Sequence, residues 1–171
     1  MTEVSHGGYD DRDLARLAAR LGHKLLASCS QITTAESCSG GWIAKVLTDV
    51  PGSSRWFGEG FVTYSNEAKV RRLGVPRSIL HTQGAVSEAV ARAMARGAIK
   101  GAGASHSIAV TGIAGPEGGV AGKPVGTVWF CWGVMHGRRL RLEVERKHFR
   151  GDRELVRRKT VRWALAHLLR R

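Results

Sequence analysis

The spacing of apolar side chains along the chain predicts helices that alternate with short strands. From Asp10 onward, leucine and alanine recur every three or four positions, which is the period of an amphipathic helix, and aspartate is a common first residue of a helix. Similar patterns predict further helices over residues 42–47, 66–73, 87–100 and 152–169, and strands over residues 31–35, 61–64, 106–111, 125–134 and 140–149. This alternation favours an α/β layered domain, and a predicted hairpin between the last two strands makes its sheet mixed.

The length of 171 residues fits one domain with a sizeable core. We predict a flexible leader over residues 1–9 and a single domain over residues 10–171. The last predicted helix is apolar along one broad stripe, but it also carries Leu155, Leu165 and Leu169 on the opposite side. This second apolar side indicates a second contact, such as a subunit interface.

The composition is that of a globular protein, with 43% hydrophobic and 24% charged residues. No apolar run approaches the roughly 18 to 20 residues that span a bilayer, and the first twelve residues hold no apolar segment typical of a secretory signal. Three cysteines, Cys29, Cys38 and Cys131, lack the spacing of metal ligands. They are expected to be free thiols in a reducing cytoplasm.

The net charge of +13 is concentrated near the C-terminus. Residues 1–137 hold 14 basic and 10 acidic side chains, a net of +4, whereas residues 138–171 hold 13 basic and 4 acidic ones, a net of +9. A basic region of this kind fits a nucleic acid, an anionic small substrate or merely a solvated face. No zinc finger or RNP-type aromatic stretch accompanies it.

Small polar residues and glycines gather where three predicted strands end, over residues 33–41, 62–69 and 110–119. Ligands of open α/β sheets bind beyond the carboxyl ends of the strands, so these loops are the candidate site. Ser37 lies at a strand-to-helix turn, where backbone N–H groups can hold an anion. Alternatively, Ser37 or Ser39 simply caps the following helix.

Tyr64 and Lys69 are five residues apart, across a strand end and a short helix. This spacing lets both side chains reach one pocket, where a desolvated lysine has a lowered pKa and can act as a base. The alternative is an exposed lysine on a helix surface. None of the seven histidines stands in a motif, so neither a serine–histidine triad nor a zinc site is predicted.

Five segments, in this order, closely resemble the CinA C-terminal domain family. They are TAESCSGG at residues 34–41, GFVTYSNEAK at 60–69, GAVS at 84–87, TGIAGP at 111–116 and KPVGTV at 123–128. The resemblance covers about residues 10–170, and five ordered motifs are far more specific than a lone glycine pattern. It implies a three-layer α/β/α domain with a mixed, mostly parallel β-sheet.

The family includes stand-alone amidases that hydrolyse the carboxamide of nicotinamide mononucleotide (NMN) to nicotinic acid mononucleotide and ammonia. The resemblance implies that Ser37 is the nucleophile and that Tyr64 and Lys69 activate it. The chemistry is reasonable, because a serine hydroxyl is a weak nucleophile and needs a base. Attack on the amide carbon gives an oxyanion, which backbone N–H groups at residues 39–41 are placed to stabilise.

Substrate contacts are expected at Ser39, Gly40 and Thr111 in the same motifs. Position 39 is serine where the family usually has threonine, which keeps a hydroxyl but adds a rival nucleophile. The phosphate of NMN needs a cation, and Arg153 at the start of the last helix is the candidate, because an arginine there opposes the helix dipole. Alternatively, Arg153 pairs only with Asp152 or another acid.

The sequence therefore predicts a cytoplasmic NMN amidohydrolase, a homodimer that needs no metal or cofactor and has no membrane or nucleic-acid partner. The alternative is a non-catalytic CinA-like binding or regulatory module linked to competence or DNA metabolism. The basic C-terminal region is the feature that favours this alternative.

Overall fold

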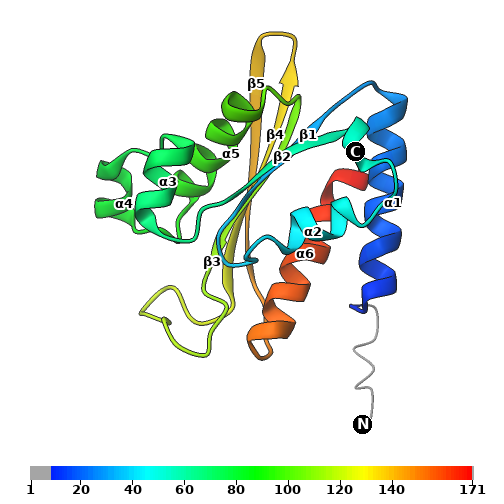
Figure 1. The fold of residues 1–171 in the computed structure, drawn as a ribbon. Helices are drawn as coiled ribbons and strands as arrows, with labels where there is room; N and C mark the ends of the chain where they lie inside the picture. The colour runs from blue at the N-terminus through cyan, green and yellow to red at the C-terminus, as the bar shows by residue number, and fades with distance from the viewer. Residues whose placement is uncertain (1–8, 171) are drawn as a thin grey trace.

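The computed structural model describes residues 9–170, which form a five-stranded sheet with helices on both faces (Figure 1). The strands, in the spatial order β2-β1-β3-β4-β5, are β1 (Ile32–Glu36), β2 (Phe57–Val62), β3 (His106–Gly112), β4 (Thr127–His136) and β5 (Arg139–His148). Except for Tyr9, the predicted leader lies outside the described residues, so the division at residues 1–9 and 10–171 stays a prediction. No helix among the described residues is long and apolar enough to cross a membrane.

The directions of the strands confirm the predicted mixed, mostly parallel sheet. β1 is parallel to both β2 and β3, whereas β4 is antiparallel to β3 and β5. Within residues 9–170, β4 is thus the one strand that runs against the other four. The hairpin that reverses the chain turns at Gly137, whose φ of 60° lies in the left-handed region that glycine tolerates.

The helices form the two outer layers of the α/β/α arrangement (Figure 1). One face of the sheet carries α1 (Asp11–Ala27), α2 (Trp42–Thr48) and α6 (Arg153–Leu169). The other carries α3 (Asn66–Leu73), α4 (Arg77–Gln83) and α5 (Glu88–Ala102). Each layer buries its own apolar cluster against the sheet, and the larger cluster lies under α1, α2 and α6.

Three elements differ from the sequence prediction, because each buries little apolar surface: β2, α4 and a short 3-10 helix, η1 (Ser53–Arg55), that was not predicted. β2 begins at Phe57, not at residue 61, and its residues 58–60 are exposed glycines and a glutamate at the edge of the sheet. α4 was not predicted, and none of its residues is buried. A pattern of apolar residues gives no signal for such elements.

The second apolar side of α6 reflects packing within the chain. Leu165 is fully buried, and α6 contacts both α1 and the sheet strand β4. Because α6 packs against both its neighbour α1 and the sheet, Leu165 is covered within its own chain, and the interpretation of this residue as part of a subunit interface is wrong.

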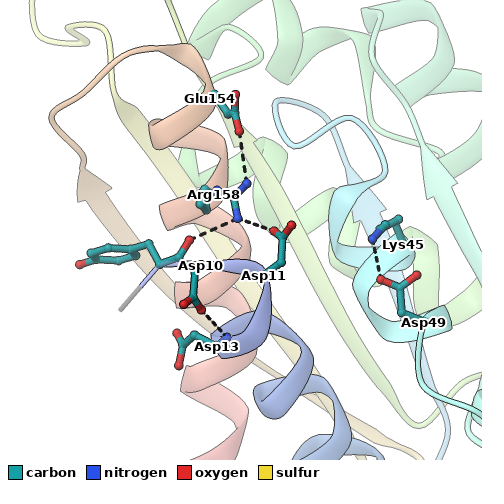
Figure 2. Close-up of polar contacts among 8 residues, drawn as sticks. Asp10, Asp11, Asp13, Lys45, Asp49, Glu154 and Arg158 are labelled. Atoms are coloured by element: carbon teal, nitrogen blue, oxygen red, sulfur yellow. Dashed lines mark hydrogen bonds and ion pairs between the residues drawn. The ribbon is translucent and has the colours of Figure 1, made fainter. Parts of the chain in front are cut away.

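Ion pairs fix the start of α6 against the start of α1 (Figure 2). The guanidinium group of Arg158 donates to the carboxylates of Asp11 and Glu154. Arg157 and Arg153 lie one and five residues before Arg158, and their guanidinium groups donate to the carbonyls of Ser39 and Gly115 at the carboxyl edge of the sheet.

Candidate active site

Three loops that follow β1, β2 and β3 meet at the carboxyl edge of the sheet, as the sequence predicts. The N–H of Thr63 donates to the carbonyl of Glu36 at 2.8 Å, and the N–H of Ser37 donates to that of Val110 at 3.1 Å. These bonds extend the parallel pairing by one residue beyond the strands. The side chains of the three loops therefore face one another.

Ser37 and Lys69 are brought together within this edge. The Nζ atom of Lys69 lies 2.9 Å from the Oγ atom of Ser37, 2.7 Å from the carbonyl oxygen of Thr63 and 3.3 Å from that of Tyr64. Lys69 is 1% exposed and Ser37 8%. Lys69 forms no ion pair with any carboxylate of the described residues.

Burial lowers the pKa of Lys69 from 10.5 to about 8, because the charged ammonium loses its hydration there. A sizeable fraction of the amine is therefore neutral near physiological pH. As a charged ammonium, Nζ donates to Ser37 Oγ and to the carbonyls of Thr63 and Tyr64. A neutral amine has two N–H bonds for the two carbonyls and a lone pair for the hydroxyl of Ser37. The arrangement matches a serine nucleophile with a lysine base.

The position of Lys69 depends on close packing between α3 and α5. A β-carbon on Gly97 of α5 would lie 2.0 Å from the carbonyl oxygen of Leu73 of α3. Only glycine allows this approach, and it draws α3, with Lys69 on its inner side, against the sheet. The alternative of an exposed helix lysine is wrong.

Cys38, the neighbour of Ser37, is not a competing nucleophile. Its thiol is 5% exposed, and burial raises its pKa to about 12. The reactive thiolate is thus scarce at neutral pH.

Glu36 organises the turn after β1, and sequence reasoning missed it. This fully buried carboxylate accepts hydrogen bonds from the Ser39 hydroxyl at 2.6 Å and from the N–H groups of Ile43 at 3.0 Å and Ala44 at 2.8 Å. The hydroxyl of Ser39 is also fully buried and donates to Glu36, so it faces away from attack on a substrate. The available signal was an acid at the end of a short β-prone run, before a helix whose first turn holds no acid.

We expect Glu36→Gln to lower the free energy of unfolding by about 2 to 3 kcal/mol, because an amide cannot accept all three of these buried hydrogen bonds. Urea unfolding measures the change. Glu59→Gln, at an exposed position on β2, is the matched control and should stay within about 0.5 kcal/mol of the wild type. Equal losses in both variants would contradict the role given to Glu36.

Two glycines let the turn fold back over Ser37. Gly40 and Gly41 have φ values of 64° and 91°, and a β-carbon on Gly41 would lie 3.2 Å from the side chain of Val62. The N–H of Gly40 donates to the carbonyl of Ser37 at 3.1 Å. Within the described residues, the N–H groups of Ser39 and Gly41 have no backbone acceptor. Ser39 is fully buried, whereas Gly41 is half-buried, so the N–H of Gly41 is the donor that an anion can reach.

Tyr64 and Arg153 form a second pair, at the mouth of the site. Tyr64 is 60% exposed, and its hydroxyl accepts a hydrogen bond from Arg153 Nη2 at 2.8 Å. Arg153 also donates to the carbonyl of Gly115, and it forms no ion pair with any described acid. Tyr64 meets Lys69 through its carbonyl oxygen, while its hydroxyl points to Arg153.

Two further residues hold the loops in place. Thr111 is 1% exposed, and its hydroxyl donates to the carbonyl of Ala85 at 2.8 Å. Arg157, which the sequence analysis did not single out, donates to the carbonyl of Ser39 at 2.8 Å and lies over the ring of Trp42. Its signal was its position one helical turn after Arg153.

Comparison with known proteins gives consistent matches along most of the chain. Residues 14–171 match the family model described as the CinA C-terminal domain. The nicotinamide-nucleotide amidohydrolase PncC of Escherichia coli (strain K12) is 49% identical over 158 residues, which cover 92% of this chain and 94% of that protein. The protein of that name from Pseudomonas putida is 53% identical over 156 residues, covering 91% and 95%. The crystal structure of competence damage-inducible protein A from Klebsiella pneumoniae matches with a TM-score of 0.87 and 42% identity, covering 92% of this chain and 96% of that one.

Proposed function

Since this chain belongs to the CinA C-terminal domain family, we propose that it is an amidohydrolase that converts NMN to nicotinic acid mononucleotide and ammonia. The observation that carries this proposal is the buried contact of 2.9 Å between Ser37 Oγ and Lys69 Nζ. The relatives named nicotinamide-nucleotide amidohydrolase support the choice of substrate.

In the proposed reaction, neutral Lys69 takes the hydroxyl proton of Ser37 while Oγ bonds to the carboxamide carbon. The N–H group of Gly41 stabilises the resulting oxyanion. The carbon–nitrogen bond then breaks as Lys69 returns its proton to the leaving nitrogen, which departs as ammonia. Lys69 next deprotonates a water molecule that hydrolyses the ester on Ser37, and the proton returns to Oγ.

The contacts of the remaining site residues indicate roles in holding the loops and in binding the phosphate. Ser39 and Thr111 keep the loops in place through their buried hydroxyls, and Gly40 keeps the turn open beside the substrate. Tyr64 orients Arg153, whose guanidinium has donors beyond the two in use and binds the phosphate of NMN.

Ammonia release from NMN by the purified protein tests the proposal most directly. A salt-dependent DNA-binding assay on the same preparation tests the alternative of a non-catalytic module in DNA metabolism. Ammonia release without DNA binding is the expected result. DNA binding in the absence of any release of ammonia would overturn the proposed activity.

We expect kcat/KM for NMN to rise with pH and to level off above about pH 8, since the base must be deprotonated to accept the proton of Ser37 and burial lowers the pKa of Lys69 to about 8. The rate should fall about tenfold for each pH unit well below this pKa. Ammonia release at constant ionic strength from pH 6 to 9.5 measures the profile. A rate that does not change between pH 7 and 9 would argue against Lys69 as the base.

Arg153→Ala should raise KM for NMN more than it lowers kcat, because the phosphate is remote from the amide and is bound equally in the ground and transition states. Loss of a charged hydrogen bond corresponds to about 10- to 150-fold weaker binding. Nicotinamide riboside, which lacks the phosphate, is the matched control substrate. If the variant uses both substrates equally less well, Arg153 does not bind the phosphate.

We further propose that the protein acts in the cytoplasm as a homodimer. The three cysteines, Cys29, Cys38 and Cys131, are all free, which supports a reducing compartment.

A further inference from the structure

The peptide group that joins Gly40 to Gly41 carries the N–H given to the oxyanion, yet it forms no backbone hydrogen bond within residues 9–170. Both glycines have positive φ values, of 64° and 91°, and glycine has more conformational freedom than any other residue. The direction of the Gly41 N–H therefore depends on how the residues on either side of this peptide group are held.

The guanidinium group of Arg157, which belongs to α6, contacts the turn on both sides of that peptide group. Its Nη2 atom donates to the carbonyl of Ser39 at 2.8 Å. The same atom would lie 3.1 Å from a β-carbon on Gly40, so the guanidinium occupies the space beside a residue that has no side chain. Beyond Gly41, the guanidinium carbon of Arg157 lies 5.3 Å from the ring centroid of Trp42, which is a cation–π contact.

Ser39 is held at two points, and Arg157 supplies the outer one. The hydroxyl of Ser39 donates to the buried carboxylate of Glu36 at 2.6 Å, and its carbonyl accepts from Arg157. This carbonyl belongs to the peptide group directly before the one that carries the oxyanion donor. Two fixed points limit the rotation of the chain there, so Arg157 sets the orientation from which the donor peptide starts.

Arg157 is itself held on a rigid element. Its neighbour Val156 is buried, and the next residue, Arg158, donates to the carboxylates of Asp11 and Glu154 (Figure 2). Arg157 is half-buried and forms no ion pair with any carboxylate of the described residues. Its guanidinium is thus directed at the turn and not at an acid.

We propose that Arg157 is a positioning residue, which holds the Gly40–Gly41 peptide group so that its N–H points at the oxyanion formed on the substrate. This inference rests on the proposed amidohydrolase activity. The oxyanion is present in the transition state and absent from bound NMN, so a residue that aims its donor affects kcat and leaves KM unchanged. Arg153, one helical turn earlier, is expected to show the opposite pattern, because the phosphate is bound in both states.

Arg157→Ala tests the inference with two substrates. For NMN, kcat should fall about 10- to 100-fold, because loss of an oxyanion donor costs about 10²- to 10³-fold and this variant misplaces the donor without removing it. KM should stay within about twofold of the wild-type value. Nicotinamide riboside forms the same oxyanion without a phosphate, so its kcat should fall by the same factor. Ammonia release over a range of substrate concentrations measures both constants.

Arg158→Ala is the matched control on the same helix. Arg158 lies over the same ring of Trp42, at 4.9 Å, but its hydrogen bonds go to Tyr9, Asp11 and Glu154. Its loss should lower the free energy of unfolding in urea and leave kcat within about twofold of the wild type. Arg157→Lys keeps a cationic donor for the carbonyl of Ser39, so it should recover part of the kcat that Arg157→Ala loses.

Four outcomes would overturn the role of Arg157 while the wild type still releases ammonia. They are a kcat of Arg157→Ala near the wild-type value, an equal loss of kcat in Arg158→Ala, an Arg157→Lys variant no more active than Arg157→Ala, and a rise in KM for NMN without one for nicotinamide riboside. The last of these would assign Arg157 to the phosphate. A wild type that releases no ammonia from NMN would instead contradict the proposed activity itself. Circular dichroism shows whether each variant is folded.

Discussion

Ser37→Ala is expected to reduce kcat for NMN by about 10⁴-fold or more, because the variant lacks the oxygen that bonds to the carboxamide carbon. The hydroxyl of Ser37 contacts Lys69, and the side chain is almost fully buried, so its loss removes one small group and leaves the turn intact. Binding of NMN, measured by calorimetry, should therefore change little. Ammonia release under single-turnover conditions measures the loss of the chemical step.

Ser39→Ala is the matched control for this variant. Ser39 has its hydroxyl on Glu36, so its removal should affect the free energy of unfolding more than the chemistry. Activity of Ser37→Ala near that of the wild type would overturn the assignment of the nucleophile, and loss of activity in Ser39→Ala alone would transfer it to Ser39.

The edge of the sheet that holds the site was predictable from the sequence because glycine and small polar residues leave a clear signal there. Ser37 precedes two glycines that the turn requires, with φ values of 64° and 91°. Strands that alternate with helices make the sheet largely parallel, and parallel strands bring their carboxyl ends to one edge. The meeting of the three loops follows from these two features.

The partners of the site residues were less predictable, because they depend on packing between distant elements. The sequence left open whether Lys69 is buried, and the answer depends on the contact of α3 with α5 at Gly97. The spacing of Tyr64 and Lys69 predicts that both side chains reach one pocket. In the structure the tyrosine hydroxyl instead accepts a hydrogen bond from Arg153, 89 residues further along the chain. In the sequence, Glu36 does not differ from other polar residues. Its role follows from the three donors that the folded chain places around its carboxylate.

Lys69→Met is expected to lower kcat by about 10² to 10⁴-fold, because general-base assistance contributes that much. Methionine has a similar length and no charge, so it fills the buried space without accepting a proton. Tyr64→Phe is the matched comparison, since it removes the phenol hydroxyl, which is the alternative proton acceptor. If Lys69 takes the proton, Tyr64→Phe should chiefly raise KM, through the loosened Arg153. A larger loss of kcat in Tyr64→Phe than in Lys69→Met would make Tyr64 the proton acceptor.

The same Lys69→Met variant should change how stability depends on pH. The folded protein lowers the pKa of Lys69 to about 8, whereas the unfolded chain keeps it near 10.5, so the unfolded chain holds the proton more tightly between these values. In that window the wild type gains stability relative to the variant as the pH rises. The gain should total about 3 kcal/mol, since one pKa unit corresponds to about 1.4 kcal/mol. Below pH 8 the folded wild type must keep a charged amine out of water, a penalty that methionine does not have.

Urea unfolding of both proteins at a series of pH values measures this difference, and the titration of all other groups cancels between them. The variant also loses the two hydrogen bonds from Lys69 to the carbonyls of Thr63 and Tyr64, which lowers its free energy of unfolding by an amount that does not depend on pH below about 8. The diagnostic quantity is therefore the slope of the free energy of unfolding between pH 8 and 10.5. Stability curves that run parallel through this window would mean that Lys69 keeps an ordinary pKa in the folded protein. A lysine of that kind stays charged at neutral pH and cannot take the proton of Ser37, so the pH profile of kcat/KM and the unfolding curves must agree.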